Sequence, residues 1–201
     1  MSWEQLRGWF DFQDIYDEAV ADASTNTPTI MVEIGVGFGR SLAYLARKAI
    51  DSGKPIRVVG IDPWIDDWNP DWEREGETAR PTWGAEHAEW ARSQGGPFNA
   101  FLAGMREHAR EELEFVRILR LKSRYAAALF PQGLLDFVFV DGSHRYEDVR
   151  RDIVDWRDRV RPDGGVIAGH DHTASFPGVV RAVSELMPTA TIRGASWWVR
   201  R

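Results

Sequence analysis

Five short apolar runs, separated by segments with helical spacing, set the strongest limit on how this chain can fold. The runs are nearly continuous in apolar character, which is typical of parallel strands covered on both faces. Their alternation with helices favours a doubly wound, mostly parallel α/β sheet, and "TATIRGASWWVRR" adds a predicted antiparallel hairpin at the end. The predicted strands span residues 29–35, 56–62, 115–121, 135–141 and 164–171.

Two other segments complete the predicted organisation of a single domain over residues 1–201. Apolar residues at helical spacing predict a helix over residues 3–22. Residues 63–96 have five Trp, three Pro and no strand period. A segment this long between strands is usually functional or disordered, and its tryptophans argue against disorder. We therefore interpret residues 63–96 as an ordered, lid-like insertion over the active face.

Charge and composition exclude several classes of protein. The formal net charge of −6 does not indicate a nucleic-acid partner. No apolar run approaches the roughly 20 residues of a membrane span, so no membrane partner is expected and a cytoplasmic location is the default. The absence of cysteine excludes disulfides and thiolate chemistry. A homodimer is a further expectation, because some tryptophans of the insertion could anchor a contact between copies.

Titratable residues follow four of the five predicted strands. Glu33, Asp62 and Asp141 end the first, second and fourth strands, and His170 and Asp171 end the fifth. Open parallel sheets bind ligands at the carboxyl ends of their strands. Any one of these acids could instead be a turn or helix-capping residue. Several at one edge favour a ligand or metal site.

The loop "VEIGVGFGRS" predicts a particular kind of ligand. Arg40 stands where the dinucleotide fingerprint requires glycine, and Glu33 would repel a pyrophosphate but suits an ammonium group. Asp62 is placed to accept hydrogen bonds from two ribose hydroxyls. These features describe a nucleoside with a cationic amino-acid tail and no phosphate. The loop's glycines permit a tight turn and close approach of the backbone to a ligand: Gly35, Gly37 and Gly39.

Four motifs carry a resemblance to a known family. "VEIGVGFG", "VVGID", "LDFVFVDGSHRYEDV" and "GGVIAGHD" resemble class I S-adenosylmethionine-dependent methyltransferases. More narrowly, they resemble the metal-dependent sugar O-methyltransferases related to the macrocin and mycinamicin enzymes. The resemblance covers residues 29–200 and implies a Rossmann-like fold. The pattern D-G-x-H-x-Y-E followed by G-G-x-x-x-G-H-D is much more specific than the glycine motif.

The resemblance also implies roles for individual residues. His144 would be the catalytic base, and Asp141 would act with it while holding Mg²⁺ or Mn²⁺ together with His170 and Asp171. The macrocin pattern has two carboxylates after the fifth strand, so His170 puts the full ligand set in question. S-adenosylmethionine would be bound by the glycine loop and its neighbouring acids: Glu33, Gly35, Gly37, Gly39 and Asp62.

The adenine contact is not assigned by the resemblance. Many family members carry an acidic residue after the third strand near the adenine, where this chain has Lys122 and Ser123. Ser123 is kept as a candidate cofactor-binding residue. His144 also has an alternative interpretation as a helix cap.

Together the motifs predict an O-methyltransferase that acts on a small hydroxylated acceptor. The first expectation is a saccharide or glycoside, such as a precursor of a mycobacterial-type methylated polysaccharide. A catechol-type acceptor is the alternative within this class, because a Trp-rich lid suits either ring. A cofactor-binding module without catalysis is another alternative. An NAD(P)-linked oxidoreductase is disfavoured by Arg40 and Glu33.

Overall fold

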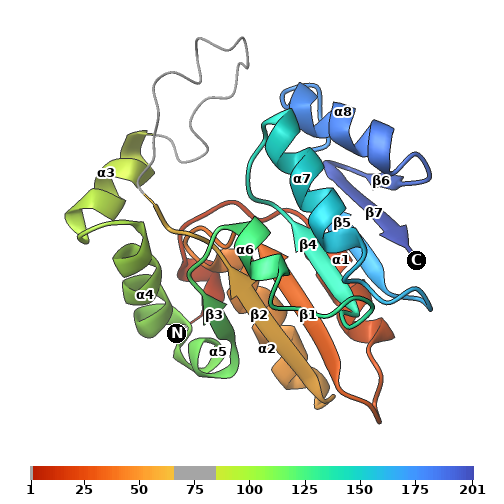
Figure 1. Ribbon diagram of the computed structural model, residues 1–201. Coiled ribbons are helices and arrows are strands. Elements are labelled where there is room, and N and C mark those ends of the chain that lie inside the picture. The colour runs from red at the N-terminus through yellow and green to blue at the C-terminus, as the bar shows by residue number, and fades with distance from the viewer. Residues whose placement is uncertain (1, 66–84) are drawn as a thin grey trace.

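A single mixed sheet runs through the centre of the computed structural model, which describes residues 2–65 and 85–201. The strand order is β3-β2-β1-β4-β5-β7-β6, in which β7 runs antiparallel to both of its neighbours (Figure 1). The five strands from β3 to β5 in this order pair in parallel, and β6 and β7 form the C-terminal hairpin, which confirms the predicted fold class. The strands are β1 Thr29–Ile34, β2 Ile56–Ile61, β3 Arg117–Leu119, β4 Phe137–Val140, β5 Val166–Gly169, β6 Thr191–Arg193 and β7 Ser196–Arg200.

Helices cover both faces of this sheet. On one face α1, α2 and α4 pack with strand residues such as Met31 and Phe139, and on the other face α6, α7 and α8 pack with Val32 and Val138. Successive strand side chains point to opposite faces, so each strand serves both cores. No helix in the described parts of the chain has the length and apolar character to cross a bilayer. The helices are α1 Gln13–Asp22, α2 Arg40–Ser52, α3 Ala85–Ser93, α4 Pro97–His108, α5 Arg110–Phe115, α6 Ser123–Ala127, α7 Tyr146–Arg157 and α8 Pro177–Leu186.

The N-terminal region differs from the single helix predicted over residues 3–22. A 3-10 turn, η1 (Trp3–Gln5), is followed by an irregular segment, and α1 begins only at Gln13. The aromatic rings explain the difference, since Trp3 and Phe10 each lie 4.9 Å from the Tyr44 ring of α2. The segment follows this aromatic packing instead of a helical repeat.

Two further boundaries differ from the sequence prediction. The third strand has three residues, because Phe115 at its predicted start ends helix α5. The predicted insertion at 63–96 lies partly outside the described residues. Of its described ends, Trp64 is buried at 2% exposure and residues 85–93 form α3.

Helix α1 is tied to the C-terminal hairpin by its acidic face. Arg193 in β6 lies 3.1 Å from Asp14 and 3.0 Å from Glu18, and Arg200 in β7 lies 2.5 Å from Asp22. These acids are spaced four residues apart and share one side of the helix. The pairing joins opposite ends of the chain over one face of the sheet.

Candidate functional site

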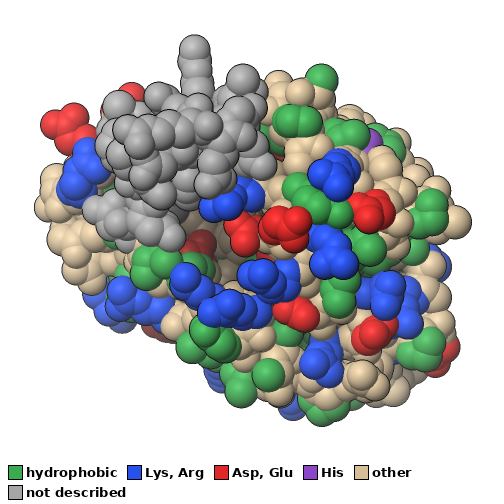
Figure 2. Space-filling view, turned by 45° about the horizontal axis from the view of Figure 1, so that its top comes forward, with side chains coloured by type: hydrophobic (Ala, Val, Ile, Leu, Met, Phe, Trp, Pro, Cys, Tyr) green, Lys and Arg blue, Asp and Glu red, His purple; other side chains and the backbone are tan. Residues whose placement is uncertain are grey.

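The carboxyl ends of β1, β2, β4 and β5 meet at one edge of the sheet, at the top of Figure 1. Figure 2 turns this edge toward the viewer and shows a hollow beside the residues drawn in grey. Acidic side chains lie next to the hollow, and Lys and Arg side chains gather along its rim. The strand-end residues singled out by the sequence therefore belong to one region of the molecule.

The glycine loop after β1 packs closely against the chain that leaves β4. Gly35 has a φ of +90°, and a Cβ built there would lie 2.0 Å from the Asp141 carbonyl oxygen. Gly39 is the N-cap residue of α2, and a Cβ there would lie 2.8 Å from the ring of Phe101. Gly37 also has a positive φ, but a Cβ there would meet no heavy atom of residues 2–65 and 85–201 within 4 Å. Gly37 therefore marks the open point of the loop.

Asp62, at the end of β2, holds this loop in place. Its Oδ2 accepts a hydrogen bond from the Gly37 N–H at 3.0 Å, and its Oδ1 accepts one from the Trp64 N–H at 2.6 Å. The Trp64 indole then donates to the Gly37 carbonyl oxygen at 2.7 Å. Trp64 is a structural part of the loop that sequence reasoning placed only within the insertion. A carboxylate oxygen has two lone pairs, so Asp62 keeps capacity for further donors.

Glu33 lies beneath the glycine loop. It is 1% exposed, and its two carboxylate oxygens accept hydrogen bonds from the Tyr16 hydroxyl at 2.8 Å and the Ser41 hydroxyl at 2.7 Å. Burial raises the pKa of Glu33 to about 8, against the opposing effect of these hydrogen bonds. The carboxyl group therefore supports the loop from below, and its predicted contact with a cofactor ammonium group stays a prediction.

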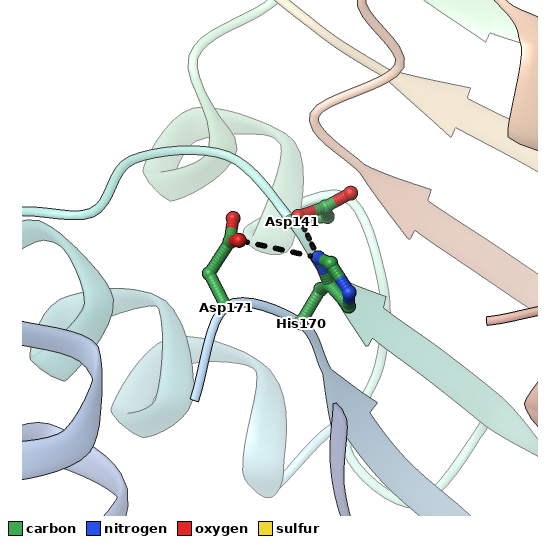
Figure 3. Close-up of side chains that lie close together, drawn as sticks. All are labelled: Asp141, His170 and Asp171. Atoms are coloured by element: carbon green, nitrogen blue, oxygen red, sulfur yellow. Dashed lines mark ion pairs between the residues drawn. The ribbon is translucent and has the colours of Figure 1, made fainter. Parts of the chain in front are cut away.

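Asp141, His170 and Asp171 come together at the ends of β4 and β5, as Figure 3 shows. His170 Nδ1 lies 3.3 Å from Asp171 Oδ1 and 3.9 Å from Asp141 Oδ1. One ligand atom from each residue lies within 4.8 Å of the others. Asp171 adopts a left-handed φ of +59°, which is uncommon for a residue with a side chain. This backbone turn directly follows β5, where the cluster forms.

His144 joins the same cluster through Asp171. Its Nε2 lies 2.6 Å from Asp171 Oδ2, and its ring lies 4.1 Å from the Phe176 ring. The exposed fractions of the two paired side chains are only 11% and 18%. His144 and Asp171 therefore form a partly buried imidazole–carboxylate pair.

The charges of the cluster are unevenly compensated. Burial raises the pKa of Asp141 to about 6, despite the opposing charge of His170. Burial would also raise the pKa of Asp171, but hydrogen bonds from His144 and His170 hold it below its ordinary value. The pKa of His170 is raised because its acidic neighbours outweigh the effect of burial. Asp141 is thus the acid that would gain most from an added positive charge.

Asp11 is a member of this region that the sequence did not reveal. Its Oδ1 lies 2.9 Å from His170 Nε2, and its side chain is 73% exposed. The predicted helix over residues 3–22 hid this contact, because Asp11 in fact lies in the irregular segment before α1. No strand-end signal marks it.

Ser123 lies away from the Asp141 cluster, at the start of α6. Its hydroxyl oxygen accepts a hydrogen bond from the Trp156 indole at 2.7 Å. It also lies beside the buried carboxyl group of Asp152 in α7, whose pKa it lowers. The structure thus gives Ser123 internal partners, and its contact with a cofactor stays a prediction.

A family model described as a methyltransferase domain matches residues 32–172 of this chain. The match contains the glycine loop, Asp62 and the whole Asp141–His170–Asp171 cluster. The chain belongs to this methyltransferase-domain family. In this methyltransferase, the matched residues run from within β1 to just beyond β5, so they include the region where the four strand ends meet.

Solved structures show the same fold for this methyltransferase domain. The calicheamicin methyltransferase CalS11 is 19% identical, with a TM-score of 0.59 over 94% of this chain and 76% of that chain. The O-methyltransferase NovP is 20% identical, with a TM-score of 0.65 over 94% of this chain and 78% of that chain. The O-methyltransferase TomG from Streptomyces achromogenes is 17% identical, with a TM-score of 0.56 over 94% and 78%. None of the curated proteins matches the sequence.

Proposed function

We propose that this methyltransferase transfers the methyl group of S-adenosylmethionine to a hydroxyl group of a small acceptor. The observation that carries the proposal is the position of the Asp141 cluster directly against the glycine loop, since the Gly35 backbone packs on the Asp141 carbonyl. A cofactor bound at the loop and a hydroxyl bound at the cluster would be close neighbours. Holding the reacting atoms in line contributes roughly 7–11 kcal/mol to such reactions.

The cofactor would lie over the open point of the glycine loop. No heavy atom of the described residues lies within 4 Å of the place where a Gly37 Cβ would stand, so on that side a ligand could approach the backbone. Asp62 fixes this loop and has lone pairs left for ribose hydroxyls. Glu33 would act mainly through its support of the loop, while Ser123 would lie on the side of the cleft after β3.

The donor set of the cluster fits a divalent cation. Asp141, His170 and Asp171 offer two carboxylates and an imidazole, and carboxylate ligands favour Mg²⁺ or Mn²⁺, with histidine shifting the preference toward Mn²⁺. The raised pKa of buried Asp141 is a second sign of fit. Burial disfavours its ionised form, and a cation beside it would stabilise that form. A cation at this position supplies Lewis acidity that lowers the pKa of a bound hydroxyl.

His144 is proposed to accept the proton of the acceptor hydroxyl. With Nε2 hydrogen-bonded to Asp171, a neutral imidazole carries its lone pair on Nδ1. As the acceptor oxygen forms its bond to the methyl carbon, the carbon–sulfur bond breaks and S-adenosylhomocysteine leaves. Asp171 orients the ring and stabilises the imidazolium that forms.

We propose a saccharide or glycoside as the acceptor, as in the macrocin-type enzymes. Trp9 is 61% exposed, and its ring lies 4.9 Å from the ring of His87 in α3. The His87 ring in turn stacks on Phe38 of the glycine loop at 5.9 Å, so Trp9 offers an aromatic surface near that loop. One structural neighbour is named as a calicheamicin methyltransferase and another as an O-methyltransferase. A catechol-type acceptor is the second candidate, because an aromatic ring would stack on the same surface.

Two measurements test the proposed function. Calorimetry with S-adenosylmethionine, S-adenosylhomocysteine and NAD is expected to show binding of the first two compounds and none of NAD. Incubation with S-adenosylmethionine and a panel of glycosides and catechols, with Mg²⁺ or with EDTA, is expected to release S-adenosylhomocysteine only with Mg²⁺. Binding of NAD alone would contradict the proposal, while turnover of catechols alone would replace the saccharide with the second candidate.

A further inference from the structure

Two serine–aspartate pairs connect α7 to two different loops at the carboxyl edge. The Ser143 hydroxyl, in the loop after β4, donates to Asp148 Oδ2 at 2.9 Å. Ser123, which begins α6 after β3, lies beside Asp152 and lowers the pKa of its carboxyl group, and it accepts a hydrogen bond from the Trp156 indole of α7 at 2.7 Å. Asp148 and Asp152 lie four residues apart, so they share one face of α7. A single helix thus holds both loops by the same kind of contact.

The two loops stand on opposite sides of the glycine loop. In the sheet β3 and β4 are separated by β2 and β1, a distance of about 14 Å at roughly 4.8 Å per strand. The glycine loop and Asp62 follow the two strands in between. The cofactor proposed to lie over these two strands would therefore have one anchored loop on each side.

The contact at Asp152 is built into the interior. Asp152 is 8% exposed, and the Trp156 indole, in a side chain with no exposed surface, donates to the same Ser123 hydroxyl at 2.7 Å. A hydroxyl that accepts from Trp156 keeps its own proton for donation, and the Asp152 carboxyl group is the acidic partner beside it. A Cβ added at Gly142 would lie 3.9 Å from Asp152 Oδ2, so Asp152 also packs beside the second loop. Helices α6 and α7 lie side by side around this contact (Figure 1).

We propose that α7 fixes the width of the cofactor cleft by holding both loops, and that Asp152 is the positioning residue at the centre of this connection. The inference rests on the proposed function, since it assigns Asp152 to the same cofactor site. Asp152 is placed beneath the loops, so it would act through Ser123 and the Gly142 backbone. Its role is to keep the two walls at the separation that the cofactor needs.

The chemistry of Asp152 suits a hydrogen-bond acceptor more than a charge. Burial raises its pKa to about 7, and the neighbouring Asp148 and Asp155 add to this rise against the effect of the Ser123 hydrogen bond. A neutral side chain with a carbonyl oxygen should therefore be tolerated at this position. This gives a conservative substitution, Asp152→Asn, that keeps the acceptor and removes the charge.

Calorimetric titration with S-adenosylhomocysteine tests the inference in the full chain. We expect Asp152→Ala to raise the Kd roughly tenfold, the usual effect of one lost buried hydrogen bond, while Asp152→Asn stays within about threefold of the unmodified protein. Asp155→Ala, on the same helix, is the matched control and should bind normally. Asp148→Ala removes the more exposed pair and provides a second variant should Asp152→Ala fail to fold.

A double-mutant cycle of Ser123 and Asp152 distinguishes a positioning role of Asp152 from a general loss of stability. Ser123→Ala and Asp152→Ala should weaken binding by less together than the sum of the single effects, because they break the same contact. Normal binding by both Asp152→Ala and Asp148→Ala, or equal losses in Asp152→Asn and Asp152→Ala, would overturn the inference. No binding by the unmodified protein would instead overturn the proposed function.

Discussion

Carboxylates lie in both halves of the site, and their partners differ. At the glycine loop, each oxygen of Glu33 and Asp62 accepts a hydrogen bond from a protein hydroxyl or backbone N–H. In the cluster after β4 and β5, Asp141 has a histidine no closer than 3.9 Å, and Asp171 lies between two imidazoles. In the first half, donors from the protein itself satisfy the carboxylate oxygens. The second half concentrates acids and imidazoles that suit an added cation and a proton transfer.

We expect this difference to separate two tasks of the proposed site, cofactor binding and the methyl-transfer chemistry. Satisfied hydrogen bonds rigidify a loop and fix its shape for a ligand. Perturbed titratable groups in a partly exposed cluster are typical of the reacting part of a site. Substitutions in the two halves should therefore have separable consequences, in binding of the cofactor for one half and in turnover for the other.

Loss of a carboxylate from the cluster should have the largest effect. We expect Asp141→Ala to abolish turnover, because the remaining carboxylate and imidazole cannot hold a hard cation that keeps much of its water. Calorimetry should show that the variant loses Mn²⁺ binding and keeps binding of S-adenosylhomocysteine. In the unmodified enzyme, EDTA should abolish turnover and added Mg²⁺ should restore it. Full activity in EDTA would remove the metal from the mechanism.

Substitution at Gly37, the open point of the glycine loop, should remove cofactor binding and leave metal binding intact. We expect Gly37→Val to abolish cofactor binding while Mn²⁺ binding is retained, because the new side chain fills the space above the loop. Gly53→Val is the matched control, since Gly53 also has a positive φ and open space but lies at the far end of α2. It carries the same backbone strain and should bind the cofactor normally. Normal binding by Gly37→Val would show that the loop is only a turn.

Substitution of the proposed base, His144, should lower the turnover rate without changing the affinity for the metal or the cofactor. His144→Ala is expected to lower the rate by roughly 10²–10⁴, the usual contribution of a positioned base. Binding of Mn²⁺ and of S-adenosylhomocysteine should stay near that of the unmodified enzyme. His172→Ala, at a histidine just beyond the cluster, serves as the control. A normal rate for His144→Ala would leave this histidine as a structural partner of Asp171.

Asp62 should give a moderate loss of cofactor affinity. Asp62→Ala is expected to weaken S-adenosylmethionine by about 1–3 kcal/mol, because ribose hydroxyls and the Gly37 N–H would lose their acceptor. Asp62→Asn keeps one acceptor oxygen and should lose less affinity in the same calorimetric titration. Equal affinity of Asp62→Ala and the unmodified protein would place the ribose contact elsewhere.

The smallest effect on turnover is expected from a substitution of Glu33, which should instead change how the free energy of unfolding depends on pH. Its pKa of about 8 lies above the ordinary 4.5, so between these values the folded chain holds a proton that the unfolded chain releases. Its contribution therefore makes the free energy of unfolding fall as the pH rises from about 5 to about 8. Glu33→Gln should reduce that fall in denaturant titrations at several pH values. An identical pH dependence in both proteins would show that Glu33 ionises as an ordinary acid.

The sequence predicted the positions that follow strands better than it predicted loops and distant partners. Parallel strands end at one edge, so Asp141, His170 and Asp171 could be placed together from their order in the chain alone. Asp11 could not be found this way, because aromatic packing determines the path of its segment. The role of Trp64 likewise depends on a hydrogen bond to a loop 27 residues earlier. Contacts that arise from tertiary packing leave little trace in local spacing.

The pairing of α1 with the C-terminal hairpin has a consequence for the order of folding. Hydrogen bonds between Arg193 and Asp14, and between Arg200 and Asp22, join residues that are 179 and 178 positions apart. Closing so long a loop has a high entropic cost, and contacts of this range slow folding. We therefore expect the acidic face of α1 to acquire its partners late, after the central strands have assembled. Until then, a refolding chain would present this acidic face to solvent.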